Sequence, residues 1–510
     1  MGGCAKGLRQ AALAVCAAVM AAATGWAYIV FAGASASLET LPFGAAFCAA
    51  FVWAGRALGR RPERRLKRIF PVVLAGMTAL YALISVWFMH AYRYTPVWDP
   101  DAVFTGAQNW LAGSLTAANT PTFDAATYFY YFPNNLGATL IMKCWFSLTR
   151  GMDPYIAACT LNTALSAGMI AFTGLAAREM GGVRMGLRAL LILGCTLPVW
   201  FSCAAFYTDF LSVCFPVGAL YFALKAEKAK GKWAQGAFFA LFALMAAVGA
   251  MIKITVLILP IGVVLWQIMR RKWRFAACAA LAAGLLFALG QLILHESVYP
   301  DQLDPALAAQ MNTPLQHWIM MGLRGDGYYN GWDYEFTRSF PDAESAKKAI
   351  DFEIVRRIRE MGPAGFFEHI FRKMGICISD GTLMLSDYYD DSPVGPRWCR
   401  ELLLPGGSAY GIWRAVCGGV HMAQLALAIT GAVREIKRGA KGISGAMYIC
   451  LFGLLVFLSM WETSKRYWIN FMPVLVLCAA QGARFGRKNL RADGANANRG
   501  QKGMENAAQE

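Results

Sequence analysis

Long apolar runs recur along the whole chain and limit what it can fold into. Each run is about 17–25 residues long, which is the helix length that crosses a bilayer core of about 30 Å. Of the 510 residues, 57% are hydrophobic and 15% are charged, and the mean hydropathy is +0.42. A soluble protein of this length would need more polar surface to cover its core. The sequence therefore predicts an all-α polytopic membrane protein.

The formal charge of +17 is unevenly distributed. Basic residues crowd the short link 56–68, and similar basic links follow at 178–188, 225–233, 270–274 and 434–441. The long segment 296–408 instead holds 17 acidic and 11 basic residues. Short basic links mark the cytoplasmic side of a membrane protein, so the acidic segment is expected outside. The charge thus predicts orientation in a plasma membrane and no nucleic-acid partner.

The apolar runs and the charge rule together predict about twelve transmembrane helices, with both termini in the cytoplasm. The predicted spans are 11–32, 40–56, 69–91, 155–177, 187–205, 208–226, 234–251, 253–270, 275–295, 409–431, 443–460 and 467–482. Residues 134–149 would reverse every later loop if they also crossed, so they are predicted to form a re-entrant or interfacial helix outside. The first run could be a signal peptide, but its length favours a retained span.

Four regions are expected along the chain. Residues 1–295 form an N-terminal transmembrane module whose first outer loop is 92–133, and 296–408 form a long extracytoplasmic region. Residues 409–483 are the C-terminal transmembrane helices, and 484–510 are a disordered basic cytoplasmic tail. In the outer region, Ile350, Ile354, Ile358 and Met361 share one helix face, which favours a helix lying on the membrane surface over one that lines a substrate groove. Cys377 and Cys399 could pair there or stay free.

Polar residues that could carry chemistry gather on the predicted outer face. Asp99 and Asp101 follow an apolar run, and the loop that they open closes with the stretch YFYYFPNN, residues 128–135. Asp209 begins the span 208–226, where it could simply cap a helix. Lys253 lies at the outer end of its span. Glu462, Lys465, Arg466 and Tyr467 lie between the last two spans, where the cations could be interfacial anchors.

These elements, in this order, resemble the GT-C glycosyltransferases. The matching stretches are WDPDAVF (98–104), YFPNNLG (131–137), FYTD (206–209) and the E-x-x-x-R-Y pattern of residues 462–467. Within that group the chain is similar to bacterial membrane proteins related to protein O-mannosyltransferases and aminoarabinose transferases. The resemblance covers roughly residues 69–482.

The resemblance implies transfer of a sugar from a polyprenyl-phosphate donor to a glycan, lipid or protein acceptor at the extracytoplasmic face. It implies Asp99 or Asp101 as the general base, with Asp209 as a supporting acid. The donor phosphate would be held by Arg466, Lys253 and Lys465. The substrate-binding residues would be Tyr131, Asn134, Asn135, His317, Glu462 and Tyr467. No cofactor is indicated, although a divalent metal ion is compatible with these residues.

Two other functions fit part of the pattern. A polytopic transporter would have a similar number of spans, but it usually carries charges or broken helices near the membrane midplane. The predicted spans hold few charges at that depth. A ligase or flippase for a lipid-carried glycan is harder to separate, because ligases also use arginines in outer loops.

Overall fold

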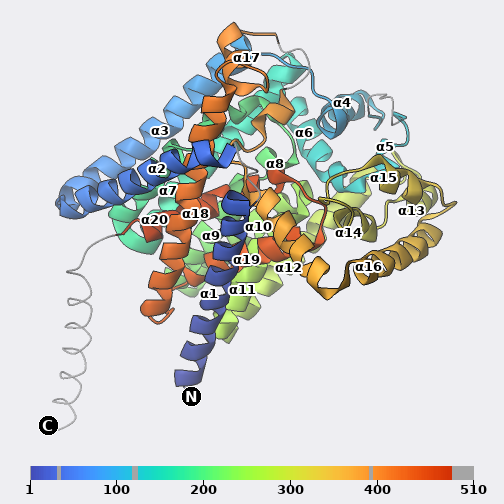
Figure 1. The fold of residues 1–510 in the computed structure, drawn as a ribbon. Helices are drawn as coiled ribbons and strands as arrows, with labels where there is room; N and C mark the ends of the chain where they lie inside the picture. The colour runs from blue at the N-terminus through green and yellow to red at the C-terminus, as the bar shows by residue number, and fades with distance from the viewer. Residues whose placement is uncertain (1, 31–35, 118–123, 390–393, 485–510) are drawn as a thin grey trace.

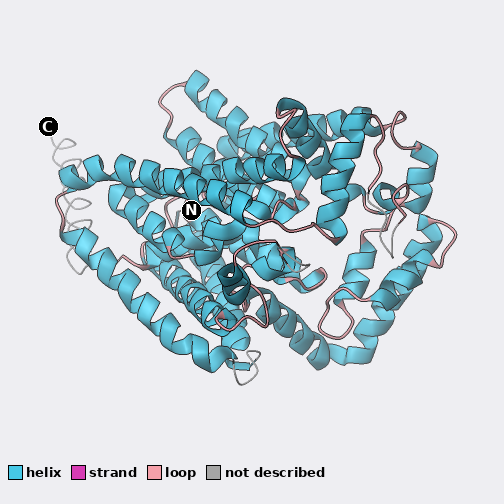
Figure 2. Ribbon diagram, turned by 90° about the horizontal axis from the view of Figure 1, so that it is seen from above, coloured by secondary structure: helices cyan, strands magenta, loops and turns pink. Residues whose placement is uncertain are grey.

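The computed structural model describes residues 2–30, 36–117, 124–389 and 394–484, and every regular element within these ranges is helical. Figure 2 shows helices and loops throughout the described chain. Arg93 and Val394 form one isolated antiparallel bridge between distant segments. The predicted all-α architecture is confirmed.

Eight helical segments are long and apolar enough to cross a membrane, which identifies the chain as a membrane protein. They are Cys4–Tyr28, Glu39–Arg60, Glu63–Ala91, Pro154–Gly194, Thr208–Lys228, Lys232–Ile252, Trp273–Val298 and Tyr410–Lys437. The helices in them are α1 (Gly2–Gly25), α2 (Ala36–Arg60), α3 (Glu63–Ala91), α7 (Pro154–Gly194), α8 (Thr208–Leu211), α9 (Cys214–Lys228), α10 (Lys232–Ile252), α12 (Trp273–Val298) and α18 (Tyr410–Lys437).

Shorter helices occupy the other predicted spans. They are η4 (Ile254–Leu257) with α11 (Ile258–Met269), α19 (Gly445–Met460), and η6 (Lys465–Phe471) with α20 (Met472–Gly482). Helix α7 runs through two predicted spans and kinks at Gly181 and Gly182, where Gly182 has a φ of 73°. It is followed by η3 (Leu197–Ala204). A helical segment therefore lies in each predicted span, while the number of twelve crossings stays a prediction.

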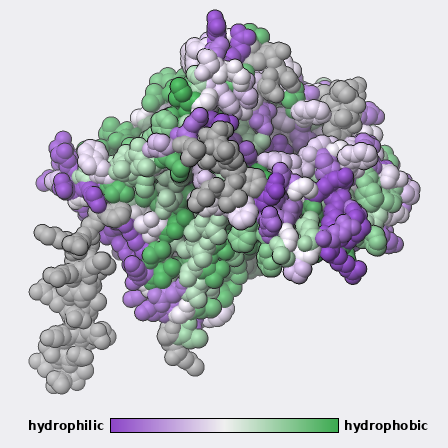
Figure 3. Space-filling view, in the orientation of Figure 1, coloured by the Kyte–Doolittle hydropathy of each residue, from purple (hydrophilic) through white to green (hydrophobic). Residues whose placement is uncertain are grey.

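The outward faces of the long helices are apolar. On α12, Leu281, Leu285, Leu289 and Leu292 are all exposed. Residues at these spacings lie on one side of a helix, so α12 presents a continuous apolar stripe. Figure 3 shows broad apolar areas over the helical bundle and polar areas over α16. Such a stripe is stable against lipid tails and costly in water.

The remaining helices gather at one side of the bundle, on the right in Figure 1. They are α4 (Trp98–Ala112), α5 (Tyr128–Tyr131), η2 (Pro133–Asn135), α6 (Leu136–Leu148), α13 (Pro305–Met311), α14 (Gln316–Gly322), α15 (Gly331–Arg338) and α16 (Ala343–Ile378). Near the top of that view lies α17 (Arg397–Leu403), and η5 (Leu385–Tyr388) precedes it in the chain. Helix α6 has 13 residues, about 20 Å, so it is too short to cross a bilayer alone.

Helix α16 differs from a simple surface helix. Ile350, on the face predicted to meet the membrane, is fully buried with Met320 of α14. Arg357 donates to both carboxylate oxygens of Asp333, at 2.6 and 2.8 Å, which fastens α16 to α15. The helix kinks at Gly362, whose φ is 64°. Cys377 and Cys399 are both buried and free, so the possible pairing is not present.

Helices α6 and α10 pack closely together, and this contact lies next to polar residues of the candidate site. A methyl group on Gly137 of α6 would lie 2.0 Å from the carbonyl oxygen of Met251 in α10. Asn135 precedes Gly137 by two residues, and Lys253 follows Met251 by two residues. Small residues allow membrane helices to approach this closely. The absence of a side chain at Gly137 therefore sets the distance between the two segments.

We expect the Gly137→Ala substitution to destabilise the protein by about 1–3 kcal/mol, because the added methyl group must push backbone apart. The measurement is the thermal unfolding midpoint of the purified protein in detergent. Gly284→Ala on α12 is the matched control, because its methyl group meets nothing within 4 Å. Equal midpoints for Gly137→Ala and wild type would contradict the tight α6–α10 contact.

Candidate functional site

Asp99 lies in the first turn of α4 and is held by two tyrosine hydroxyls. Tyr128 donates to Oδ1 at 2.6 Å, and the Tyr207 hydroxyl lies 3.2 Å from Oδ2. Asn135 completes the group, donating through Nδ2 to the Tyr128 oxygen at 2.7 Å, with its Oδ1 3.1 Å from the Tyr207 hydroxyl. The hydrogen bonds hold the carboxylate in one orientation. Asp99 is only half-buried, so a ligand can still reach it.

Both tyrosines remain hydrogen-bond donors at neutral pH. Burial, and then the negative charge of Asp99, raise the pKa of Tyr128 well above its ordinary value. The same two causes raise the pKa of Tyr207. A protonated phenol can donate to a carboxylate, so these two side chains orient Asp99.

Asp209 forms a second group with two cations. Its side chain is buried, with 1% exposed, and it makes an ion pair and hydrogen bond with Lys253. Arg466 Nε lies 3.8 Å from Oδ2, and the Tyr388 hydroxyl donates to the same oxygen at 3.1 Å. Asp209 is in the first turn of α8, yet the N-cap residue is Tyr207, and no side chain caps this helix. Capping therefore does not account for Asp209.

Tyr207 joins the two groups. Its hydroxyl lies beside Asp99, and the Arg466 guanidinium stands over its ring, 5.5 Å from the centroid. Lys253 stands over the ring of Tyr467 at 4.5 Å. Cations bind to aromatic faces through the ring quadrupole. Tyr207 thus contacts the Asp99 carboxylate through its hydroxyl and the Arg466 guanidinium through its ring face.

Several buried polar atoms near Arg466 lack a hydrogen-bond partner. They are Arg466 Nε, Glu462 Oε2 and Thr463 Oγ1. The other carboxylate oxygen of Glu462 accepts a hydrogen bond from Tyr467. Burial raises the pKa of Glu462, which is the expected response of a carboxyl group with few polar partners. Buried polar groups are usually satisfied, so this cluster has unused capacity to bind a polar ligand.

The long segment 296–408 contributes to the site through Tyr388, to which the sequence had given no role beside Asp209. From the sequence, the acids Asp387, Asp390 and Asp391 with Tyr388 and Tyr389 could bind a cation or a polar acceptor, although such a cluster is more often a solvated turn. Tyr388 and Tyr389 are instead buried, and the Tyr388 hydroxyl binds Asp209. Asp390 and Asp391 lie outside the described residues. Tyr128 and Tyr207 were also missed, although Tyr207 lies in the FYTD stretch that carries the resemblance and Tyr128 lies in the stretch YFYYFPNN that closes the loop.

Four other predicted site residues have no hydrogen bond or ion pair with Asp99 or Asp209 within the described residues. Asp101 accepts a hydrogen bond from Thr105 of its own helix at 2.9 Å, and burial raises its pKa. The ring of Tyr131 contacts the Arg338 guanidinium, 4.1 Å from the centroid. Asn134 is exposed and lies beside Asn135. Lys465 is half-buried. The functional roles given to these residues stay predictions.

His317 is buried at the contact between α14 and α15. Its Nδ1 atom lies 2.7 Å from the Thr337 hydroxyl, and Nε2 has no hydrogen-bond partner. Burial lowers the pKa of His317 to about 4. This environment favours a neutral imidazole that supports the packing of α14 against α15.

We expect acid to destabilise the protein partly through His317. Between pH 6.5 and 4 the unfolded chain binds a proton that the folded protein does not, so stability falls as the pH falls. The loss attributable to this group is at most about 3 kcal/mol. Thermal unfolding at pH 6.5 and 4.5 should show a smaller pH effect in His317→Asn, which keeps a polar atom for Thr337. His295→Asn, at an exposed position, is the control and should match the wild type. An unchanged pH effect in His317→Asn would contradict this expectation.

No group of three or more His, Cys, Asp or Glu side chains suited to a metal ion occurs within residues 2–30, 36–117, 124–389 and 394–484. The two groups around Asp99 and Asp209 are instead built from single carboxylates with tyrosines and cations. Their arrangement fits proton transfer and anion binding.

Residues 62–484 match the family described as conserved hypothetical integral membrane protein. The chain belongs to this family. The matched range includes Asp99, Asp209 and Arg466. A comparison of this chain with curated proteins found no match.

Solved structures show a weak likeness. The chain is similar to ArnT from Cupriavidus metallidurans bound to undecaprenyl phosphate, with 12% identity, a TM-score of 0.38, and coverage of 81% of this chain and 77% of that one. The apo state of the same protein gives 14% identity, a TM-score of 0.38, and coverage of 82% and 78%. An Archaeoglobus fulgidus oligosaccharyltransferase tethered to an acceptor peptide gives 11% identity, a TM-score of 0.30, and coverage of 82% and 56%. At these values the function has to be inferred from the site itself.

Proposed function

We propose that the protein is a membrane glycosyltransferase that moves one sugar from a polyprenyl-phosphate donor to an acceptor hydroxyl at the extracytoplasmic face. The acceptor is a glycan, a lipid or a protein. One observation supports the proposal most strongly: the half-buried carboxylate of Asp99 and the guanidinium of Arg466 both contact the side chain of Tyr207. The reaction needs one group that takes a proton and one that holds a phosphate, close together.

In this reaction Asp99 takes the proton from the acceptor hydroxyl as its oxygen attacks the anomeric carbon of the sugar. The bond between that carbon and the phosphate oxygen breaks, and polyprenyl phosphate leaves with the bonding electrons. A positioned carboxylate makes the hydroxyl a better nucleophile. The two tyrosines fix the direction in which Asp99 presents its oxygen atoms.

Arg466 and Lys253 stabilise the charge that develops on the leaving phosphate. Guanidinium groups bind phosphate through paired hydrogen bonds, and fixed cations in a water-poor site favour a charged transition state. The Nε atom of Arg466 supports this role, because it has an ion pair with Asp209 but no hydrogen-bond partner, and a ligand oxygen could accept its hydrogen bond. Asp209 is then a positioning residue that holds both cations.

Of the two acids in the first outer loop, Asp99 is the better base. Tyr207 connects Asp99 to the cation group, whereas Asp101 bonds within its own helix to Thr105. A general base must reach the proton while the donor phosphate lies nearby. We therefore assign the base to Asp99 and give Asp101 no step.

The proposal is tested with membranes that contain the full chain and are supplied with undecaprenyl phosphate carrying a radiolabelled hexose or pentose. A transferase moves the label to a second molecule and releases undecaprenyl phosphate. Label that crosses sealed vesicles while still attached to its carrier would indicate a flippase. Substrate flux without bond cleavage would indicate a transporter, and either result would overturn the proposal.

A further inference from the structure

A cavity of about 250 Å³ lies at the far end of the η6–α20 segment from the candidate site. Arg466, near the start of that segment, is in the candidate site, whereas Gln481 and Arg484, at its end, line the cavity. The segment from Lys465 to Gly482 spans roughly 30 Å by its helical rise. The two sites are therefore separated by about the thickness of a bilayer core.

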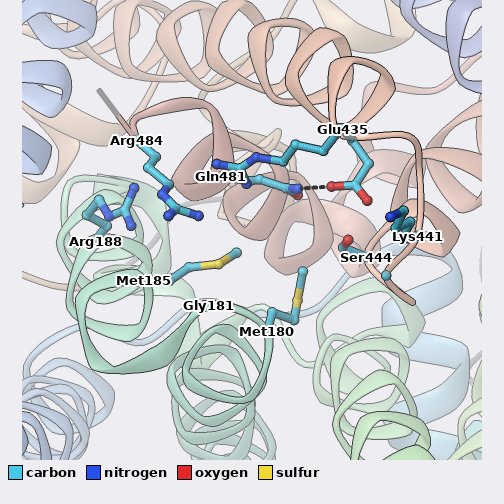
Figure 4. A pocket seen from close by; sticks show the side chains of 11 residues that line it. Met180, Gly181, Met185, Arg188, Glu435, Lys441, Ser444, Gln481 and Arg484 are labelled. Carbon is cyan, nitrogen blue, oxygen red and sulfur yellow. Dashed lines mark hydrogen bonds between the residues drawn. The ribbon is translucent and has the colours of Figure 1, made fainter. Parts of the chain in front are cut away.

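The cavity is lined mainly by cations. Arg188, Arg438, Lys441 and Arg484 line it, with Glu435 as the single carboxylate among the lining residues. Glu435 accepts a hydrogen bond from Gln481 at 2.7 Å. Figure 4 shows Arg188 and Arg484 on one side, Lys441 on the other, and Met180 and Met185 between them. The cavity thus carries excess positive charge beside an apolar wall.

Arg188 is the most constrained of these cations. It is 6% exposed, and its hydrogen bonds go to the backbone carbonyls of Arg184 and Ala480, both at 3.1 Å. Arg438 and Arg484 line the same cavity as Arg188. Burying a cation among other cations is costly unless an anion compensates it. The arrangement therefore favours an anion in the cavity.

Helix capping explains part of the cluster. Arg188 donates to the Ala480 carbonyl and Arg434 donates to the Gly482 carbonyl, both at the C-terminus of α20, where cations are favourable. Capping does not explain Arg438 and Lys441. They come from the turn between α18 and α19, yet they line the same cavity.

We propose that this cavity is a phosphate-binding site separate from the candidate active site. Arginines recognise phosphate oxygens through paired donors, and Ser444 and Gln481 add polar groups to the lining. The phosphate belongs either to the headgroup of an anionic lipid, which the neighbouring methionines suit, or to free inorganic phosphate. This inference does not depend on the proposed reaction.

The test uses the full chain in phosphatidylcholine nanodiscs with two probes. In one arm phosphatidylglycerol is added to the bilayer, and the lipid retained by the protein is counted by native mass spectrometry. In the other arm inorganic phosphate is titrated and the thermal unfolding midpoint is followed. We expect binding in at least one arm, and we expect Arg438→Gln with Lys441→Gln to weaken it roughly tenfold or more. The arm that responds identifies the source of the phosphate.

Arg64→Gln is the matched control, because Arg64 is an exposed arginine of the basic link 56–68. It should leave binding unchanged. Arg188→Gln should abolish binding. If that variant does not fold, the double substitution of Arg438 and Lys441 provides the test, because both residues are exposed and their replacement should not affect folding. The proposal is overturned if neither probe binds, or if Arg64→Gln weakens binding as much as the double substitution does. The latter result would indicate unspecific attraction of anions to the basic face.

Discussion

Asp99→Asn is expected to lower sugar transfer by about 10²- to 10⁴-fold, which is the usual contribution of a general base. Asn keeps the shape of the side chain and an oxygen that accepts from Tyr128, but it cannot take the proton from the acceptor. The measurement is the initial rate of label transfer from undecaprenyl-phosphate sugar in membranes. Binding of the donor should change little, because Asp99 does not hold the phosphate in the proposed mechanism.

The matched control for this substitution is Asp101→Asn, two residues along the same helix. Asp101 bonds to Thr105 of its own helix, so we expect its loss to change the rate by less than about threefold. Thermal unfolding of both variants separates chemistry from folding. If Asp101→Asn stops transfer and Asp99→Asn does not, the assignment of the base is wrong.

Arg466→Gln is expected to lower the transfer rate by about 10²- to 10³-fold, as removal of a donor to a developing oxyanion usually does. Because Arg466 is proposed to hold phosphate in both the donor and the leaving group, binding of undecaprenyl phosphate should weaken as well. Arg466→Lys should recover part of the rate, since it keeps the charge and loses the paired donors. Rates and undecaprenyl phosphate binding are measured on the same preparations.

Lys465→Gln is the control for Arg466, because it removes a neighbouring cation that has no ion pair with Asp209 in the described chain. We expect this variant to keep most of the transfer rate and of the binding. An equal loss in Lys465→Gln and Arg466→Gln would mean that general positive charge, not the guanidinium of Arg466, holds the donor. Unchanged binding and rate in Arg466→Gln would remove Arg466 from the site.

The helices were predictable because their signal is local. Apolar runs of membrane-spanning length stand out in any window of the sequence, and each predicted span contains a helical segment. Residues 155–177 and 187–205 were predicted as two separate spans, and α7 is interrupted between them, where the backbone angles of Gly181 and Gly182 are not helical. Glycines at a span boundary signal either a loop or a bend, and only neighbouring contacts decide which.

The candidate site was predictable in part. Asp99, Asp209, Lys253 and Arg466 stand out as charges at the ends of apolar runs, where ionised groups are rare enough to notice. The tyrosines that connect them do not stand out, because aromatic residues are common at the ends of spans. Tyr388 comes from a segment 179 residues away from Asp209, and sequence spacing gives no sign of that contact.

The sequence by itself determined the class of protein, the helical segments and the charged residues near their ends, because bilayer thickness and the cost of burying charge act on each segment separately. The tertiary structure decided which of those charges meet. It placed Asp99 and Arg466 on Tyr207, separated Asp101 from them, and gathered Arg188, Arg438 and Lys441 around a cavity. Such contacts depend on how close helices pack, as at Gly137, and close packing joins residues that are far apart in the chain.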